Sequence, residues 1–111
     1  KPANALDGRE LECVAALLLF ETFLAEQIKN KGPTTPEGLD YTRAAKTNAA
    51  ALGWYLGRVS SMPADRVGKS AFVEANAKVR GMEAKKALVF IQDCTQNYQE
   101  NAGEAFGAWL G

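Results

Sequence analysis

Hydrophobic residues recur every three or four positions along most of the chain, which is the period of an amphipathic helix. No stretch shows the alternation of apolar and polar residues that predicts a strand. The pattern predicts helices over about residues 7–31, 36–60, 64–80 and 82–99, followed by a short C-terminal helix. We therefore expect a single all-α domain over residues 1–111, built as a small up-and-down helical bundle.

Capping signals mark the ends of the first two predicted helices. Asp7 and Glu10 have the spacing of a capping box, and Gly32 is typical of the residue that follows a helix C-terminus. Thr35 before Pro36 indicates an N-cap followed by a proline in the first turn. These signals predict that the first helix ends near residue 31 and that the second begins at residue 36.

Two stripes of apolar residues predict the core. The stripe on the first helix consists of Cys13, Leu17, Phe20, Leu24 and Ile28. The stripe on the fourth helix consists of Ala84, Ala87, Leu88, Ile91, Cys94 and Tyr98. Further apolar residues widen the first stripe beyond one face, so this helix is either central in the bundle or covered by a partner. Gly81 separates the third and fourth helices, although a single long bent helix is the alternative, because one glycine costs only about 1 kcal/mol.

The two cysteines, Cys13 and Cys94, lie on these predicted core faces. In an up-and-down bundle the first and fourth helices are antiparallel neighbours, and the two cysteines come level with each other. A disulfide between them closes a loop of roughly 80 residues and stabilises the fold by about 4–5 kcal/mol. The alternative is a pair of separate buried thiols in a reducing compartment.

A disulfide predicts a periplasmic or secreted protein, because such bonds persist in oxidising compartments. The segment Ala3-Asn4-Ala5 has the small-x-small spacing of a signal-peptidase site. The longest apolar run, residues 14–20, is too short to cross a bilayer, so we expect no membrane span.

The charges of the chain restrict the partners that we expect. Thirteen basic and thirteen acidic side chains cancel, which argues against nucleic acid as a partner. Zero net charge also permits self-association, so the expected partner is another protein or a second copy in a homodimer. The absence of histidine excludes Ser–His and Cys–His catalysis and makes a metal site unexpected. We expect no enzyme, no metal and no cofactor.

Small residues recur at every fourth position of the second predicted helix, at Ala45, Ala49, Gly53 and Gly57. Such a stripe lets another helix approach closely. Ordinary tight packing inside the bundle is the interpretation that we favour, and a helix-contact groove or dimer face is the alternative.

Aromatic residues provide the second group of candidates: Trp54, Tyr55, Phe72, Tyr98 and Trp109. They could line a small-molecule pocket between helices. We favour a role in the core, with one or two rings facing the surface.

Glu21 interrupts the apolar stretch LLLFETFL and is the most interesting of the acidic residues. A buried glutamate there could act as a ligand or as a general acid with a raised pKa. The interpretation that we favour places Glu21 on the polar side of the helix or in a pair with lysine or arginine.

The segment CTQNYQEN at residues 94–101, with Trp109 further on, resembles the C-terminal helical segment of HdeA-type acid-stress chaperones of the bacterial periplasm. The resemblance covers residues 94–109 and the general position of Cys13. It implies two cysteines joined by a disulfide, and a dimer at neutral pH that opens in acid and shields unfolding proteins. With no histidine present, only the thirteen carboxylates can respond to acid, which sets any switch near pH 4 or lower.

Together these features predict a non-catalytic secreted or periplasmic protein that acts through protein contacts, with a chaperone-like function under acid stress as the sharpest version. One alternative is an inhibitor or immunity-type protein that blocks a partner enzyme. Another is a carrier that holds a small ligand between its helices.

Overall fold

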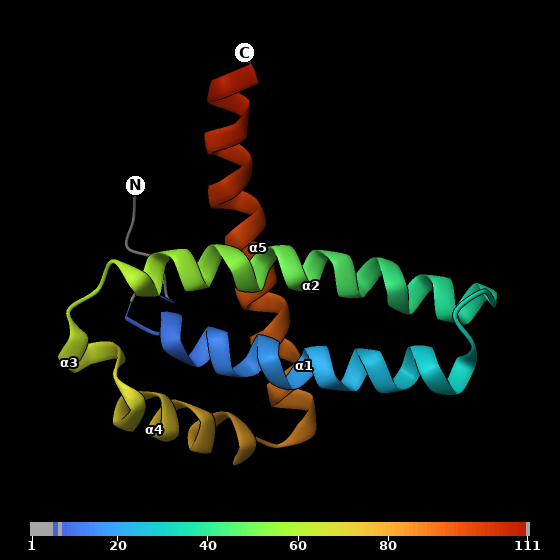
Figure 1. The fold of residues 1–111 in the computed structure, drawn as a ribbon, viewed down its shortest axis with the longest axis horizontal. Helices are drawn as coiled ribbons and strands as arrows, with labels where there is room; N and C mark the ends of the chain where they lie inside the picture. The colour runs from blue at the N-terminus through green and yellow to red at the C-terminus, as the bar shows by residue number, and fades with distance from the viewer. Residues whose placement is uncertain (1–5, 7, 111) are drawn as a thin grey trace.

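Two long helices form an antiparallel hairpin, and a third long helix crosses it (Figure 1). The computed structural model describes the backbone of residues 6 and 8–110 and the side chains of residues 6 and 8–102. The elements are α1 (Glu10–Lys31), α2 (Pro36–Ser60), the short α3 (Ala64–Val67), α4 (Lys69–Arg80) and α5 (Ala84–Leu110). The described residues contain no strand. The predicted all-α bundle with one disulfide is confirmed.

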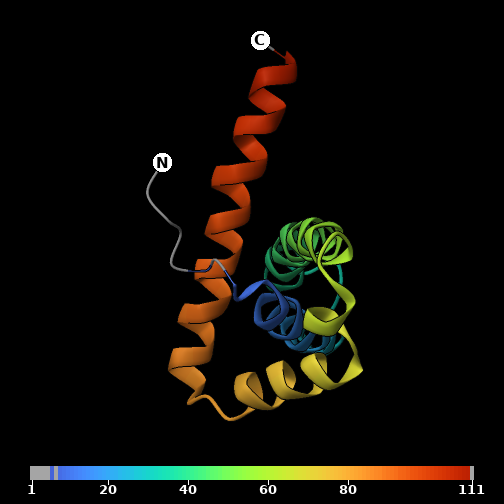
Figure 2. The same cartoon turned by 90° about the vertical axis from the view of Figure 1, so that its left-hand side faces the viewer.

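Helix α5 crosses the α1–α2 hairpin steeply on one side, as the two perpendicular views show (Figures 1 and 2). Helix α4 packs against α1, and the C-terminal part of α5 extends beyond α2. The first and last long helices therefore meet at a crossing and do not run side by side. The hydrophobic pattern identifies which face of a helix is buried, but it does not fix the angle at which the neighbouring helix crosses.

Helix α1 begins three residues later than its capping pattern predicts. Arg9 is the N-cap residue, and its side chain makes no capping hydrogen bond. Gly8 has a φ of 84°, which is incompatible with a right-handed helix and delays its start. Glu10 is buried, and its Oε2 accepts a hydrogen bond of 3.3 Å from the Gly8 N–H. Asp7 lies outside the described residues.

The predicted end of the first helix and the predicted start of the second are confirmed. Gly32 ends α1 with a φ of 94°, and the Thr35 hydroxyl caps α2 by accepting a hydrogen bond of 3.0 Å from the Gly38 N–H. A Cβ atom at Gly38 would overlap the Gly32 carbonyl oxygen. Glycine at position 38 therefore lets the second helix start close to the end of the first.

Glycines mark two of the remaining helix boundaries, but not every glycine ends a helix. Gly68 has extended backbone and divides the predicted third helix into α3 and α4. Gly81 ends α4, so the alternative of one long bent helix is wrong. By contrast, α5 continues through Gly103 and Gly107 to Leu110, and the separate C-terminal helix is wrong. A helical glycine costs only about 1 kcal/mol, which need not end a long helix.

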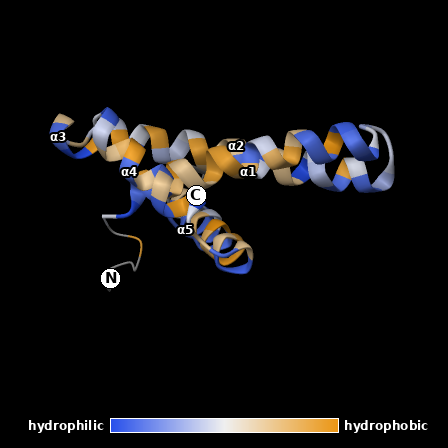
Figure 3. Ribbon diagram, turned by 90° about the horizontal axis from the view of Figure 1, so that it is seen from below, coloured by the Kyte–Doolittle hydropathy of each residue, from blue (hydrophilic) through white to orange (hydrophobic). Residues whose placement is uncertain are grey.

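The core lies where α1 is enclosed by the other helices. Five consecutive α1 residues, 13–17, are buried, so α1 is the central helix. Its neighbours contribute further buried side chains: Ala51, Tyr55, Val79, Phe90, Ile91 and Cys94. The hairpin turn lies far from this core and is largely hydrophilic, whereas hydrophobic positions concentrate towards the crossing (Figure 3).

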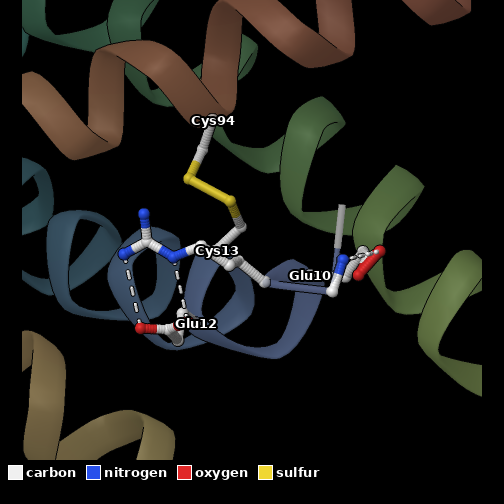
Figure 4. A network of polar contacts seen from close by, with 6 residues as sticks. Glu10, Glu12, Cys13 and Cys94 are labelled. Carbon is white, nitrogen blue, oxygen red and sulfur yellow. Dashed lines mark hydrogen bonds and ion pairs between the residues drawn. A yellow bond between two sulfur atoms is a disulfide. The ribbon is translucent and has the colours of Figure 1, made fainter. Parts of the chain in front are cut away.

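The disulfide joins α1 to α5 at their crossing (Figure 4). The Cα atoms of Cys13 and Cys94 are 5.7 Å apart, and both residues are fully buried. Beside the bond, the Arg9 guanidinium donates to the Glu12 carboxylate at 3.1 Å and also lies 4.4 Å from the centre of the Phe90 ring. The covalent bond thus fixes α5 to the central helix in the middle of the core.

Replacing both cysteines, Cys13→Ala with Cys94→Ala, is expected to lower the free energy of unfolding by about 4–5 kcal/mol, because the unfolded chain gains the entropy of an open loop. Urea denaturation followed by circular dichroism, with and without reductant, measures the change. Reductant should lower the midpoint of the wild-type protein and leave the double variant unchanged. An equal midpoint for oxidised and reduced wild type would contradict the expectation.

Candidate functional site

An open apolar cavity of about 430 Å³ lies in the angle between α1 and α5. We call it the α1–α5 groove. It is lined by Leu19, Phe20, Thr22, Phe23, Glu26, Ala84, Ala87, Leu88 and Ile91. Because α5 crosses α1 steeply, their apolar faces separate on either side of the contact. The groove is the space that this divergence leaves uncovered.

Two large apolar side chains of the groove are exposed to solvent. The exposed fraction is 46% for Phe23 and 48% for Leu88. The Phe23 ring stacks on Phe20 with centroids 5.8 Å apart and meets Tyr41 edge to face at 6.5 Å. Other large apolar side chains outside the groove are equally exposed, among them Leu39, Leu56 and Val73. The concave shape of the groove, and not exposure alone, makes it a candidate binding site.

Leu88 belongs to the stripe from which the core was predicted. Ile91 and Cys94 of that stripe are buried, whereas Leu88 is half exposed and Ala84 is exposed. The stripe correctly marks one face of α5, but the crossing covers only its middle. This part of the core prediction is wrong, and the uncovered end becomes one wall of the groove.

A second cavity, of about 620 Å³, lies between α2 and α5. We call it the amide cleft. Its lining consists of Phe20, Ala44, Thr47, Asn48, Leu88, Ile91, Gln92, Thr95, Gln96 and Gln99. Three of these, Phe20, Leu88 and Ile91, also line the α1–α5 groove, so the two cavities share a wall.

Glu21 is held by an amide from α2. It is partly buried, and its Oε2 accepts a hydrogen bond of 2.8 Å from Asn48 Nδ2. The same Nδ2 donates to the Leu17 carbonyl at 3.0 Å. Glu21 therefore helps to hold α2 against α1, and the partner shown for it is an asparagine where the sequence suggested a lysine or an arginine.

Sequence reasoning did not single out Asn48, which is 2% exposed. A signal was present, because Asn48, Ala51 and Tyr55 follow one another at helical spacing on the buried face of α2. An asparagine within such a face must make hydrogen bonds in the core. Its partners could not be identified without the tertiary structure.

The stripe of small residues faces away from the bundle. Ala49, Gly53 and Gly57 are exposed, and Ala45 is partly buried. A Cβ atom on Gly53 or Gly57 would have no described atom within 4 Å. Tight packing inside the bundle, the interpretation favoured from sequence, is therefore wrong for these glycines. A dimer face at this stripe stays a prediction.

The predicted aromatic residues do not form one site. Trp54 contacts Tyr55 and Tyr98, with ring centroids 4.9 and 5.9 Å apart, respectively. Phe72 packs against the core from α4. Neither the groove nor the cleft is lined by these residues. The side chain of Trp109 lies outside the described residues.

Tyr55 connects α2 to the disulfide-bearing turn of α5. Its hydroxyl donates a hydrogen bond of 2.7 Å to the Cys94 carbonyl and accepts one of 3.0 Å from Asn97 Nδ2. Burial raises the pKa of the Tyr55 phenol above its usual value, although the hydrogen bond from Asn97 and the charge of Arg58 act in the opposite direction. The position of this phenol makes it structural.

The ionisable side chains and cysteines of the described residues were candidates for a metal centre. Both cysteine sulfur atoms are in the disulfide. In the part of the chain that the structure describes, no three histidine, cysteine, aspartate or glutamate residues form a group that could hold a metal. Over the same residues, no helix combines the length and the apolar character needed to cross a membrane.

Comparison with known proteins identifies no relative of this chain. No family model matches the chain, and neither a curated protein nor a solved structure does. The groove, the cleft and the disulfide are therefore the features from which a function can be inferred.

Tyr55→Phe is expected to lower the free energy of unfolding at neutral pH by about 1–3 kcal/mol, because two hydrogen bonds are lost, each of which contributes about 0.5–1.5 kcal/mol. The wild-type fold should weaken further as the pH rises above 10.0, the usual phenol value, because the unfolded chain then releases the Tyr55 proton more readily than the folded chain. The Tyr55→Phe variant should not show this part of the loss of stability at alkaline pH.

Urea denaturation at neutral pH and at about pH 11 measures both effects. Tyr41→Phe, at a partly exposed position, is the control for removing a hydroxyl. An identical alkaline loss of stability in the wild type and in Tyr55→Phe would contradict the role of the buried phenol.

Proposed function

We propose that the chain is a non-catalytic protein that acts through protein contacts, and that the α1–α5 groove binds apolar side chains of its partners. The open apolar cavity with exposed Phe23 and Leu88 is the observation that carries the proposal. Burying such surface against a partner is favourable by about 25 cal/mol per Å² of apolar area. A few apolar anchors in one groove can therefore supply much of the binding energy.

The groove is suited to varied partners more than to one rigid ligand. Its open shape lets side chains of different sizes enter, and its lining carries Glu26 as its only ionisable group. Phe20, Phe23 and Leu88 offer apolar contacts without a row of directional hydrogen bonds. Such a surface selects apolar character rather than a particular sequence.

The disulfide supports a periplasmic or secreted location for this function. The bond lies in the core between helices that carry cysteines 81 residues apart, so it belongs to the fold. Such structural bonds are formed and kept in oxidising compartments. We accordingly propose that the protein binds its partners outside the cytoplasm.

The chaperone-like version of the proposal depends on acid. The resemblance of residues 94–109 to HdeA-type chaperones supports it, as does the absence of histidine. Protonating all thirteen carboxylates would leave the thirteen basic side chains unbalanced. The resulting repulsion would loosen self-association near pH 4 or lower and free apolar surface for unfolding proteins.

The test measures protection of malate dehydrogenase from aggregation at about pH 3 by light scattering. Ala87→Lys places a charge in the groove, and Val73→Lys places the same charge on α4, where Val73 is 57% exposed and does not line the groove. The wild type and Val73→Lys should protect, whereas Ala87→Lys should lose most of the protection, because burying an unpaired ammonium is costly.

Circular dichroism must show that both variants remain folded. Phe23→Ser, which removes an exposed ring, provides a second test of the groove. No protection by the wild type would contradict the chaperone-like version. A stable one-to-one complex with a native enzyme at neutral pH would point to an inhibitor. Equal activity of Ala87→Lys, Phe23→Ser and wild type would contradict the groove as the binding surface.

A further inference from the structure

The amide cleft differs in chemistry from the groove beside it. None of its lining side chains is ionisable, and six of the ten carry an amide or a hydroxyl: Thr47, Asn48, Gln92, Thr95, Gln96 and Gln99. Four of the six lie on successive turns of α5 over residues 92–99. The shared wall of Phe20, Leu88 and Ile91 is apolar. The cleft thus combines an uncharged hydrogen-bonding side with an apolar side.

Asn48 carries an unfulfilled hydrogen bond at this cleft. Its Nδ2 donates to Glu21 and to the Leu17 carbonyl, so both amide hydrogens are used on α1. Its Oδ1 is buried and has no hydrogen-bond partner in the structure. A buried polar atom without a partner costs about 1–3 kcal/mol, and native proteins normally supply one. The partner that fits this oxygen is an N–H or O–H donor.

We propose that the amide cleft binds a small uncharged molecule that carries a secondary amide next to an apolar group. The amide N–H donates to Asn48 Oδ1, and the amide oxygen accepts from a glutamine side chain or from Thr47, since the Thr95 hydroxyl already donates to the Ile91 carbonyl. The apolar group packs on Phe20, Leu88 and Ile91. The site is additional to the protein-binding groove, although the two share the apolar wall of Phe20, Leu88 and Ile91.

Size and charge both restrict the ligand. A volume of about 620 Å³ lies within the range of small-molecule sites. The lining offers no cation to an anionic ligand, and the nearby carboxylates of Glu21 and Glu100 already accept hydrogen bonds from Asn48 and Gln96, so the proposed ligand is uncharged. Because Asn48 Oδ1 is buried, the donor reaches it only when a side chain of the cleft wall shifts.

A secondary amide occurs both in peptides and in acetylated amino sugars, so the probes are N-acetyl-leucine methylamide and N-acetylglucosamine. Titration followed by two-dimensional NMR of the wild-type protein measures their binding. We expect saturable shifts at the Asn48 side-chain amide and at residues 92–99 with at least one probe. Preference for the first probe identifies a peptide-like ligand, and preference for the second identifies a sugar.

The matched ligand control is the leucine probe with both amide nitrogens methylated, which lacks N–H donors. It should bind at least tenfold more weakly. This control removes the hydrogen-bond donor of the ligand and leaves the Asn48 oxygen in place. Replacing Asn48 itself would also break its hydrogen bonds to α1. The proposal would be overturned if the methylated probe bound equally well. It would also be overturned if neither probe gave a saturable shift at concentrations up to about 10 mM, which covers weak millimolar binding.

Protein variants separate this site from the groove. Thr47→Val and Gln92→Leu remove hydrogen-bonding groups of the cleft and should weaken probe binding severalfold without reducing protection of malate dehydrogenase. Gln27→Leu on α1, outside both cavities, should change neither. Probe binding that falls with Ala87→Lys but not with Gln92→Leu would place the ligand in the groove and overturn the cleft assignment.

Discussion

Two contacts with one residue of α5 determine how the chain is arranged. The Cys94 sulfur is bonded to Cys13 in the central helix, and the Cys94 carbonyl accepts the hydrogen bond of Tyr55 from α2. One turn of α5 is thereby attached to both arms of the hairpin. Both contacts are fully buried, so water does not compete for them. The attachment holds α5 across the hairpin at a steep angle, with its two ends diverging from α1 and α2 (Figures 1 and 2).

The two candidate surfaces follow from that crossing. Towards its N-terminus, α5 diverges from α1 and leaves an apolar groove; along α2, it leaves a cleft lined by amides and hydroxyls. Phe20, Leu88 and Ile91 separate the two and contribute to both. A parallel arrangement of the same helices would bury these apolar residues in a continuous core. The proposed binding function therefore depends on a geometry that leaves part of the core face uncovered.

The sequence was most informative where chemistry is local. The cap at Thr35, the break at Gly32 and the positions of both cysteines on core faces follow from helix geometry and backbone preferences. The angle of α5 does not, because a hydrophobic stripe shows which face is buried but not how far the contact extends. For the same reason the exposure of Leu88 was not foreseen. Asn48 lies on a predictable face, but its unpaired oxygen depends on neighbours from α1 that only the fold brings near.

The account is tested most directly by the distance between α1 and α5 in oxidised and reduced protein. Spin labels are attached at positions 29 and 85, where Lys29 and Lys85 are both exposed, by a chemistry that does not use cysteine. Pulsed electron paramagnetic resonance then reports the distance between the labels and leaves Cys13 and Cys94 unchanged. A covalently fixed crossing predicts one narrow distance distribution when oxidised and a much broader one after reduction. A broad distribution in the oxidised protein, or an unchanged narrow one after reduction, would show that the bond does not hold the crossing.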